Sequence, residues 1–226
     1  ASAKQGAGIA LASIAKVDGV SKPAGGPSYL LSDSLDYANA AAAAAGGWTD
    51  TGSPSWHYTT SPFPIDGVSG SSLFLDSSSD QSVHTFSAGG DIWIYVIAQC
   101  PASIASSPYI VYLSNSSATI VAAARFISTG AVRAYAGSTT EESGAGLVSA
   151  GVTYHIWMHY VKGTGSNASC SVYVSTTSTR PAATVAETAG NATTDADRVR
   201  FYTQVGNTIG FNKLRVDDAE IGSSPT

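Results

Sequence analysis

Most of the chain alternates between apolar and polar residues with the period of two that a β-strand requires. Asp91–Cys100 (DIWIYVIAQC) and Val152–Lys162 (VTYHIWMHYVK) show this best, because both are rich in β-branched and aromatic residues. Similar stretches bounded by Gly, Ser, Asn and Pro predict further strands at Ser55–Thr60, Ser72–Asp76, Gln81–Ser87, Tyr109–Ser114, Thr119–Ser128, Ala131–Ala136, Ser169–Thr176, Arg198–Thr203 and Lys213–Ile221. Many short strands without helices between them predict an all-β protein with antiparallel sheets, a sandwich or a barrel.

Two segments depart from this pattern. The six alanines Ala40 to Ala45 are the one place where a helical turn is expected, and Gly46-Gly47 ends it. Residues 1–27 are weakly periodic and finish in a Pro/Gly cluster that is typical of a linker. The chain is therefore divided into an N-terminal arm or linker (1–27), a β-domain (28–222) and a short tail (223–226).

The amino-acid composition limits the kinds of binding partner that we expect. Charged residues make up 12% of the chain, about half of the usual share, which is common in extracellular and viral structural proteins. The net charge is −5, and the eleven Lys and Arg residues are scattered, so no nucleic-acid partner is expected. No apolar run approaches the roughly 20 residues that cross a bilayer, so no membrane span is expected either.

Cys100 and Cys170 lie far apart, each in a strand-like stretch. They form one disulfide if the chain passes through an oxidising compartment, or else two buried free thiols that pack as small apolar groups. Neither has a His or a second Cys at the spacing of metal ligands.

Three segments resemble the concanavalin A-like lectin and glucanase superfamily, which includes laminin-G-like modules. They are SYLLSDSLDYANAAAAAAGGWTDTGSPSW, VTYHIWMHYVKGTGSNASCSVYVSTTSTRP and IGFNKLRVDDAEIG, and together they span roughly residues 28–222. The resemblance implies an antiparallel two-sheet jelly-roll sandwich, and it specifies the fold better than the activity. Separately, GIALASIAKVDGVSK in the arm is similar to short segments of phage tail-associated and virion structural proteins.

The catalytic patterns of that superfamily are not found in the chain. Its glucanases place two Glu around an Asp at alternate strand positions, whereas Glu141 and Glu142 are adjacent and would face opposite ways. Asp195 and Asp197 have the right spacing but lie in a turn-like stretch. Alginate-lyase-like jelly rolls use a Gln-x-His triplet and a strand rich in Tyr and Lys, and both are missing. The sequence therefore predicts a protein that is not an enzyme.

No metal or other cofactor is expected. His155 and His159 are four residues apart on a predicted strand, about 13 Å at the usual rise, which is too far for one ion. A structural calcium stays open, because many relatives hold it in a loop, but no loop of alternating acidic residues supports it here.

Aromatic and polar residues gather on one face of the two strongest strands. A face of this kind can stack on a sugar ring and hydrogen-bond its hydroxyls, or it can be buried under a loop or another subunit. The candidate carbohydrate-binding residues, from these strands and one neighbour, are Trp93, Tyr95, Gln99, Arg125, His155, Trp157 and His159.

The leading functional prediction is a non-catalytic phage virion or surface module of jelly-roll type that adheres to host glycans. We expect it in a virion, outside the cell or at a cell surface, as a homo-oligomer among other assembly proteins. The alternative is a secreted carbohydrate-binding module, or a polysaccharide lyase or glycosidase of the same fold. In the first case the arm would dock to an assembly through its few large apolar residues, Ile9, Leu11, Ile14, Val17 and Val20.

Overall fold

The computed structural model describes residues 29–52, 54, 73–75, 80–104, 107–203 and 209–223. These residues form one short helix, α1 (Ala40–Ala45), and fourteen strands. The strands are β1 (Leu31–Asp33), β2 (Thr49–Thr51), β3 (Leu73–Leu75), β4 (Gln81–Gly89), β5 (Asp91–Gln99), β6 (Tyr109–Ser114), β7 (Ile120–Phe126), β8 (Val132–Ala136), β9 (Thr139–Glu142), β10 (Thr153–Val161), β11 (Ala168–Ser175), β12 (Val185–Gly190), β13 (Ala196–Tyr202) and β14 (Ile209–Asp217).

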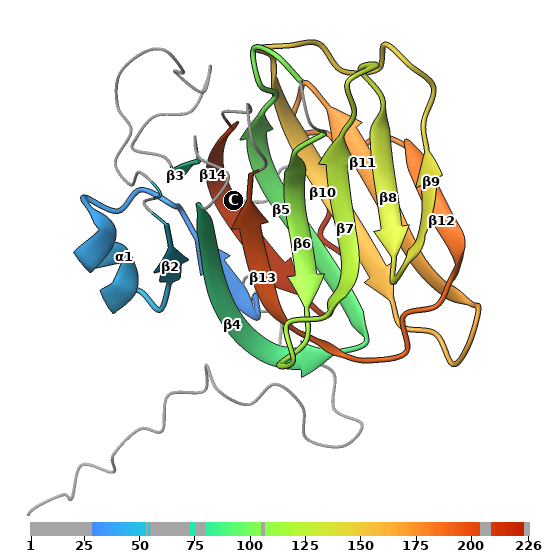
Figure 1. The fold of residues 1–226 in the computed structure, drawn as a ribbon, viewed down its shortest axis with the longest axis horizontal. Helices are drawn as coiled ribbons and strands as arrows, with labels where there is room; N and C mark the ends of the chain where they lie inside the picture. Colours follow the sequence, from blue (N-terminus) through green and yellow to red (C-terminus); the bar gives the residue numbers. More distant parts are fainter. Residues whose placement is uncertain are drawn as a thin grey trace, which may run out of the picture.

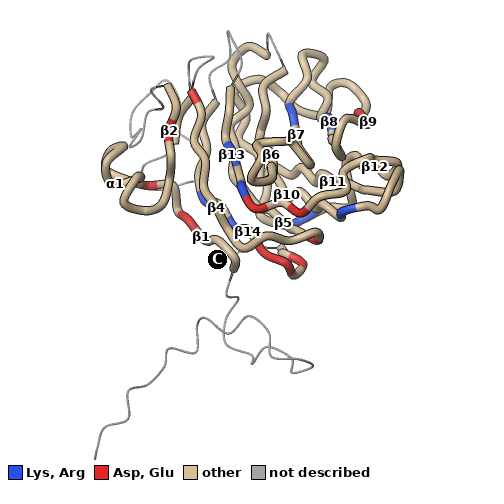
Figure 2. The backbone as a smooth tube through the Cα atoms, turned by 60° about the horizontal axis from the view of Figure 1, so that its bottom comes forward, with Lys and Arg blue, Asp and Glu red and all other residues tan. Residues whose placement is uncertain are grey.

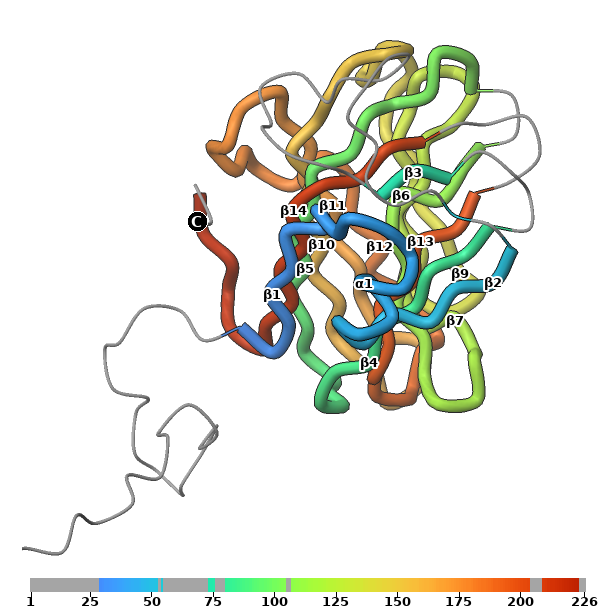
Figure 3. The backbone as a smooth tube through the Cα atoms, turned by 90° about the vertical axis from the view of Figure 1, so that its left-hand side faces the viewer, coloured from blue at the N-terminus to red at the C-terminus, as the bar shows by residue number. Residues whose placement is uncertain are grey.

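The strands form two antiparallel sheets that pack face to face (Figure 1). The front sheet, nearer the viewer in Figure 1, has the order β2-β4-β13-β6-β7-β8-β9. The back sheet has the order β1-β14-β5-β10-β11-β12, and β3 also pairs with β14. The first and last strands, β1 and β14, are neighbours in the back sheet and lie side by side (Figure 3).

This architecture confirms the predicted all-β, two-sheet sandwich. The strands expected at Asp91–Cys100, Tyr109–Ser114 and Val152–Lys162 are present, and so is the helical turn at Ala40–Ala45. The short strands β2, β9 and β12 were not predicted, because none of them shows a clear alternation. The strand expected at Ser55–Thr60 and the whole N-terminal arm lie outside the described residues, so the arm and its docking role stay predictions.

Side chains at alternate strand positions fill the space between the sheets. On β10, for example, Ile156, Met158 and Tyr160 are fully buried in this core. Cys100 and Cys170 also lie in it as free thiols, and burial raises the pKa of both to about 12. Two fully formed layers leave each sheet with one outer face, which we call the front face and the back face.

The helix α1 begins and ends where local chemistry dictates. The side chain of Asn39 caps its N-terminus by accepting a hydrogen bond from the Ala42 N–H (2.9 Å). Gly47 follows with a positive φ of 98°, which favours glycine. Within the part of the chain that the structure describes, no helix is long and apolar enough to span a membrane.

Candidate functional site

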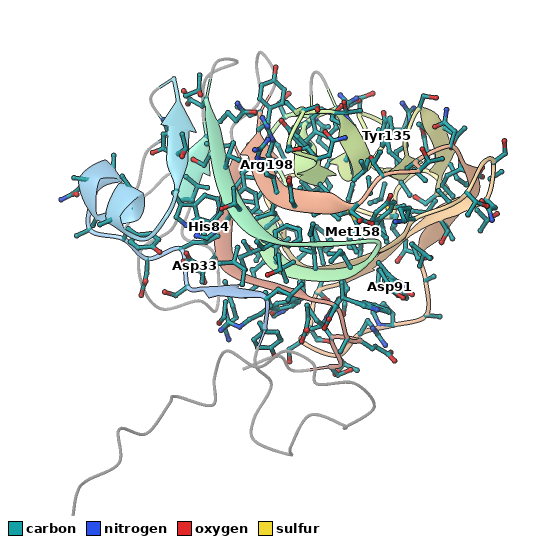
Figure 4. The ribbon with its side chains drawn as sticks, turned by 90° about the horizontal axis from the view of Figure 1, so that it is seen from below. Asp33, His84, Asp91, Tyr135, Met158 and Arg198 are labelled. Carbon is teal, nitrogen blue, oxygen red and sulfur yellow. The ribbon has the colours of Figure 1, made fainter. Side chains whose placement is uncertain are left out.

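Strand β13 sends three polar side chains to the front face. Val199 and Phe201 point into the core, so the alternation of the strand places Arg198, Arg200 and Tyr202 on the outside. Viewed from below, β4 and β13 are curved with the front face on the inside of the curve, and Arg198 and Tyr135 lie on that side (Figure 4). The front face is therefore a bent platform that carries arginine and tyrosine.

Arg200 is held at the centre of a hydrogen-bonded network that joins three strands. Its Nε donates to Ser114 Oγ on β6 (2.8 Å), and its Nη1 donates to Gln81 Oε1 on β4 (3.1 Å). The same Gln81 oxygen accepts a hydrogen bond from the Tyr112 hydroxyl (2.8 Å). Within the described residues, Arg200 Nη2 and Gln81 Nε2 donate no hydrogen bond. Two fixed, partly exposed N–H groups are therefore left for a ligand oxygen.

A second arginine stands two strands away. Arg125 on β7 donates from Nε to the Ser107 carbonyl oxygen (2.7 Å) and from Nη1 to the Tyr135 hydroxyl (3.1 Å). Its guanidinium lies 4.3 Å from the ring centroid of Tyr109, a cation–π contact. These contacts fix the position of the charge of Arg125 beside a cluster of phenol rings.

Two phenol rings lie side by side at this position. The ring centroids of Tyr109 and Tyr202 are 6.0 Å apart, and both side chains are partly exposed. Neither hydroxyl makes a hydrogen bond within the described part of the chain. Burial raises the pKa of Tyr109, and the nearby charge of Arg125 opposes that rise. Burial likewise raises the pKa of Tyr112, and Arg200 opposes it.

Arginine side chains gather on the front face of an acidic protein. Four arginines belong to its strands, two on β13 and one each on β7 and β8, whereas the whole chain carries a net charge of −5. The blue segments on β7 and β13 can be followed in Figure 2. Arg133 is paired with Glu142, to which its Nε donates at 2.9 Å. Arg198 lies 3.9 Å from a carboxylate oxygen of Asp197. Arg200 forms no ion pair with any described carboxylate, so its positive charge is available to an acidic ligand.

The back face holds most of the residues that the sequence suggested for sugar binding. Trp93, Tyr95 and Trp157 are buried there at 8%, 1% and 0% exposure. The indole N–H of Trp157 donates to the carbonyl oxygen of Gly222 (3.3 Å), and the Ile221 side chain packs into the same cluster. The C-terminal segment therefore covers this aromatic cluster.

Arg180 contacts both the aromatic cluster and the C-terminal segment that covers it. Its guanidinium lies 4.5 Å from the Trp93 ring centroid and 5.1 Å from the Tyr173 ring centroid. Its Nη1 donates to the Ile221 carbonyl oxygen (2.9 Å), and its Nη2 pairs with Glu220. The aromatic cluster of the back face is therefore covered by the chain's own residues.

The remaining predicted residues are divided between the two faces. Gln99 lies on the back sheet and donates from Nε2 to the Gly151 carbonyl oxygen (3.1 Å). His155 accepts or donates a hydrogen bond with the Tyr95 hydroxyl (2.7 Å), and His159 does so with Asp91 (2.8 Å). Arg125 alone belongs to the front face, so the structure does not bring the predicted set together as one site. A sugar-binding role for these residues stays a prediction.

Sequence reasoning missed Gln81, Tyr109, Tyr112, Arg200 and Tyr202. A signal was present in RVRFYT, where two arginines and a tyrosine occupy alternate positions of one strand. The pairing of β13 with β4 and β6 was not readable, because it joins segments separated by more than 80 residues along the chain. Within the described residues, no group of three His, Cys, Asp or Glu side chains could hold a metal ion.

Comparisons with known proteins find similarity to this chain at the level of the fold. No protein-family model and no curated protein sequence matches it. Among solved structures, an alginate lyase, Aly36B, in complex with alginate trisaccharide matches 84% of this chain and 98% of its own, with a TM-score of 0.56 and 13% identity. An endo-β-1,4-glucuronan lyase from the fungus Trichoderma reesei matches 84% of this chain and 95% of its own (TM-score 0.56, 10% identity).

A sialidase also matches 84% of this chain (TM-score 0.57, 10% identity), but this chain spans only 18% of the sialidase. At these identities the likeness shows a shared fold, the all-β sandwich. It supports the predicted jelly-roll resemblance and lends no support to the predicted similarity to phage virion proteins.

The prediction that the chain is not an enzyme is corrected by these comparisons. Its fold is shared, over nearly their whole length, by polysaccharide lyases. The sequence argument failed because it searched for the motifs of characterised families. The front face instead assembles arginine, glutamine and tyrosine side chains from β4, β6, β7 and β13.

Proposed function

We propose that the protein is a polysaccharide lyase that binds an acidic polysaccharide on the front face. The observation that carries this proposal is the network around Arg200, in which Gln81 and Ser114 fix the guanidinium while Arg200 Nη2 and Gln81 Nε2 keep unused N–H groups. A carboxylate is the ligand that such a donor pair fits best.

Charge supports the same substrate class. The front face concentrates arginine on a chain of net charge −5, and a neutral polysaccharide would leave Arg200 without an anionic partner. The lyases with the same fold act, by their names, on alginate and on β-1,4-glucuronan, which are both polymers of uronic acids. A uronic acid presents one carboxylate on each sugar.

The chemistry would be β-elimination. A base removes the proton on the carbon next to the carboxyl group, and the electron pair forms a carbon–carbon double bond while the glycosidic C–O bond at the neighbouring carbon breaks. Arg200 and Gln81 would bind the carboxylate and stabilise the negative charge that develops on it. The oxygen of the leaving chain then takes up a proton, so atoms and charges balance.

We assign the proton transfers to Tyr202, with Tyr109 beside it. Tyr202 shares the front face of β13 with Arg200, two residues away, so both can reach one sugar. As a phenolate it would accept the proton, and as a phenol it would return that proton to the leaving oxygen. Arg125, close to the ring of Tyr109, would favour the phenolate form in this cluster.

The test is a search for the unsaturated product. Alginate and β-1,4-glucuronan are incubated with the protein, and the ultraviolet absorbance of the new double bond, which is conjugated with the carboxylate, is followed. A lyase produces a rise with either substrate, and a neutral β-1,4-glucan produces none. The absence of any rise with both polyuronates would overturn the proposal.

A second candidate function is glycan binding without cleavage. The match to a sialidase, of which this chain spans only 18%, supports it, because there a domain of this fold forms a small part of a larger protein. Calorimetry with the same polysaccharides separates the two functions. Binding without an unsaturated product would favour the binding module.

A further inference from the structure

The back sheet contains a buried arginine that has no acidic partner. Arg215 on β14 is only 8% exposed, and none of the ion pairs among the described residues includes it. Its Nη1 donates to the carbonyl oxygens of Asp33 (3.1 Å) and Leu214 (2.8 Å). Its Nε is buried without a hydrogen-bond partner. Buried charges are normally paired, so we expect an anion to bind this guanidinium.

The acidic residues nearest along the strands are already engaged. The carboxylate of Asp33 accepts hydrogen bonds from the Leu35 N–H (2.7 Å), the Tyr37 hydroxyl (2.7 Å) and the Trp48 indole N–H (2.8 Å). The carboxylate of Asp217 accepts from the backbone N–H groups that follow it in the chain. Neither carboxylate reaches the guanidinium of Arg215.

The groups around Arg215 are cationic or can donate hydrogen bonds. Arg215 lies directly opposite Tyr95 on β5, and its guanidinium is 5.5 Å from the ring centroid of Tyr29. The Tyr95 hydroxyl is hydrogen-bonded to His155 Nδ1 (2.7 Å). Burial lowers the pKa of His155, and the charge of Lys213 lowers it further. Lys213 is two residues from Arg215 on β14.

The backbone at this position is strained. The pairing of β14 with β5 shifts register between Asn212 and Arg215, and Lys213 within this bulge has a φ of +50°. A residue with a side chain rarely adopts that left-handed conformation, and bulges with such strain often redirect side chains toward a site. The bulge is held by a hydrogen bond from the Lys213 N–H to the Ser34 carbonyl oxygen (3.2 Å).

We propose that Arg215 and Lys213, with the Tyr95–His155 pair, form a binding site for a small oxyanion of the carboxylate or sulfate type. An anion here would accept hydrogen bonds from Nη2 of Arg215, which donates none within the described residues, and would neutralise a charge that the chain leaves uncompensated. The site lies on the sheet opposite to the front face and does not depend on the lyase proposal.

The experiment is calorimetric titration of the full chain with sodium sulfate, sodium glucuronate and glucose at constant ionic strength. We expect sulfate to bind at one site per chain and glucose not to bind. Arg215→Met should weaken sulfate binding at least about tenfold, because it removes charge-assisted hydrogen bonds. Lys213→Met, at a partly exposed position, should weaken it by a smaller factor.

Arg133→Met removes an arginine that is already paired with Glu142 and has no role in the proposed lyase site, so it is the matched control and should leave sulfate binding unchanged. If Arg215→Met does not fold, Arg215→Lys replaces it, because it keeps the charge and loses the planar fork. Competition between sulfate and glucuronate would assign the site to acidic groups in general, and binding of sulfate alone would assign it to an inorganic anion.

The proposal is overturned if neither anion binds the wild type, or if the substitutions at Arg215 and Lys213 leave binding unchanged. It is also overturned if Arg133→Met abolishes sulfate binding, which would place the anion on the front face. The lyase assay is unaffected by any of these results.

Discussion

The front and back faces carry the same kinds of side chain, but these are buried on the back face and partly exposed on the front face. On the back face Trp157 and Tyr95 are at 0% and 1% exposure, and Ile221 and Arg180 from other parts of the chain seal them. On the front face the rings of Tyr109 and Tyr202 stay partly exposed, and no described segment covers their hydroxyls. Aromatic content therefore does not identify a ligand site, whereas uncovered hydrogen-bonding groups do.

The largest difference between the two faces should appear in stability. Trp157→Ala removes a fully buried indole from the back face and should lower the free energy of unfolding by about 3–5 kcal/mol. Tyr202→Ala on the front face removes a partly exposed ring and should cost about 1 kcal/mol or less. Denaturant unfolding of both variants measures this, and equal losses would show that the faces do not differ as described.

Much of this contrast could not be predicted from the sequence. The alternation in VTYHIWMHYVK correctly places Trp157, His155 and His159 on one side of a strand. It does not reveal that Ile221 and Gly222, more than 60 residues later, close over that side. Local pattern fixes which residues share a face, and contacts between distant segments decide whether the face is open.

The site on the front face was equally hidden, for the same reason. Arg125 was singled out from its strand, but its phenol neighbours come from β6 and β8. Arg200 was not singled out, because an arginine in a strand is ordinary until Ser114 and Gln81 are seen to fix its guanidinium. Strand order across the sheet, which the sequence leaves open, assembles the site.

The burial of Tyr95 should also be visible in alkaline solution. Burial raises its pKa to about 12, above the usual value of 10. The resulting stability is fully present below pH 10 and is lost as the pH rises from about 10 toward 12, because the unfolded chain ionises first. The loss from this one residue should be about 2–3 kcal/mol across that range.

Tyr95→Phe should remove that component, so the variant should lose less stability than the wild type between about pH 10 and pH 12. Tyr37→Phe is the comparison, since the pKa of Tyr37 is also raised to about 12 but its side chain is partly exposed. We expect the smaller effect at Tyr37. Urea unfolding at a series of pH values measures both, and an unchanged slope in Tyr95→Phe would contradict the burial of that phenol.

A smaller loss of stability is expected when the contacts of Arg180 with the C-terminal segment are removed. Arg180→Ala removes its cation–π contacts and its hydrogen bond to the Ile221 carbonyl oxygen, and should cost about 1 kcal/mol. The pair with Glu220, which is 63% exposed, adds little to this. Arg133→Ala on the front face removes a partly exposed ion pair and should change stability by less than about 0.5 kcal/mol.

Faster proteolysis at the C-terminus of Arg180→Ala, compared with Arg133→Ala, would show that the back face is held shut by this contact. Equal proteolysis of the two variants would mean that the segment is held by other contacts.

The claim that the front face carries the activity is tested most directly by one assay of three proteins on polyuronate. The wild type should generate the ultraviolet absorbance of an unsaturated uronate. Tyr202→Phe, which deletes one hydroxyl on the front face, should lower the rate about a hundredfold or more. His155→Ala on the back face should stay within a few-fold of the wild type. A full rate in Tyr202→Phe, or a loss confined to His155→Ala, would contradict the account.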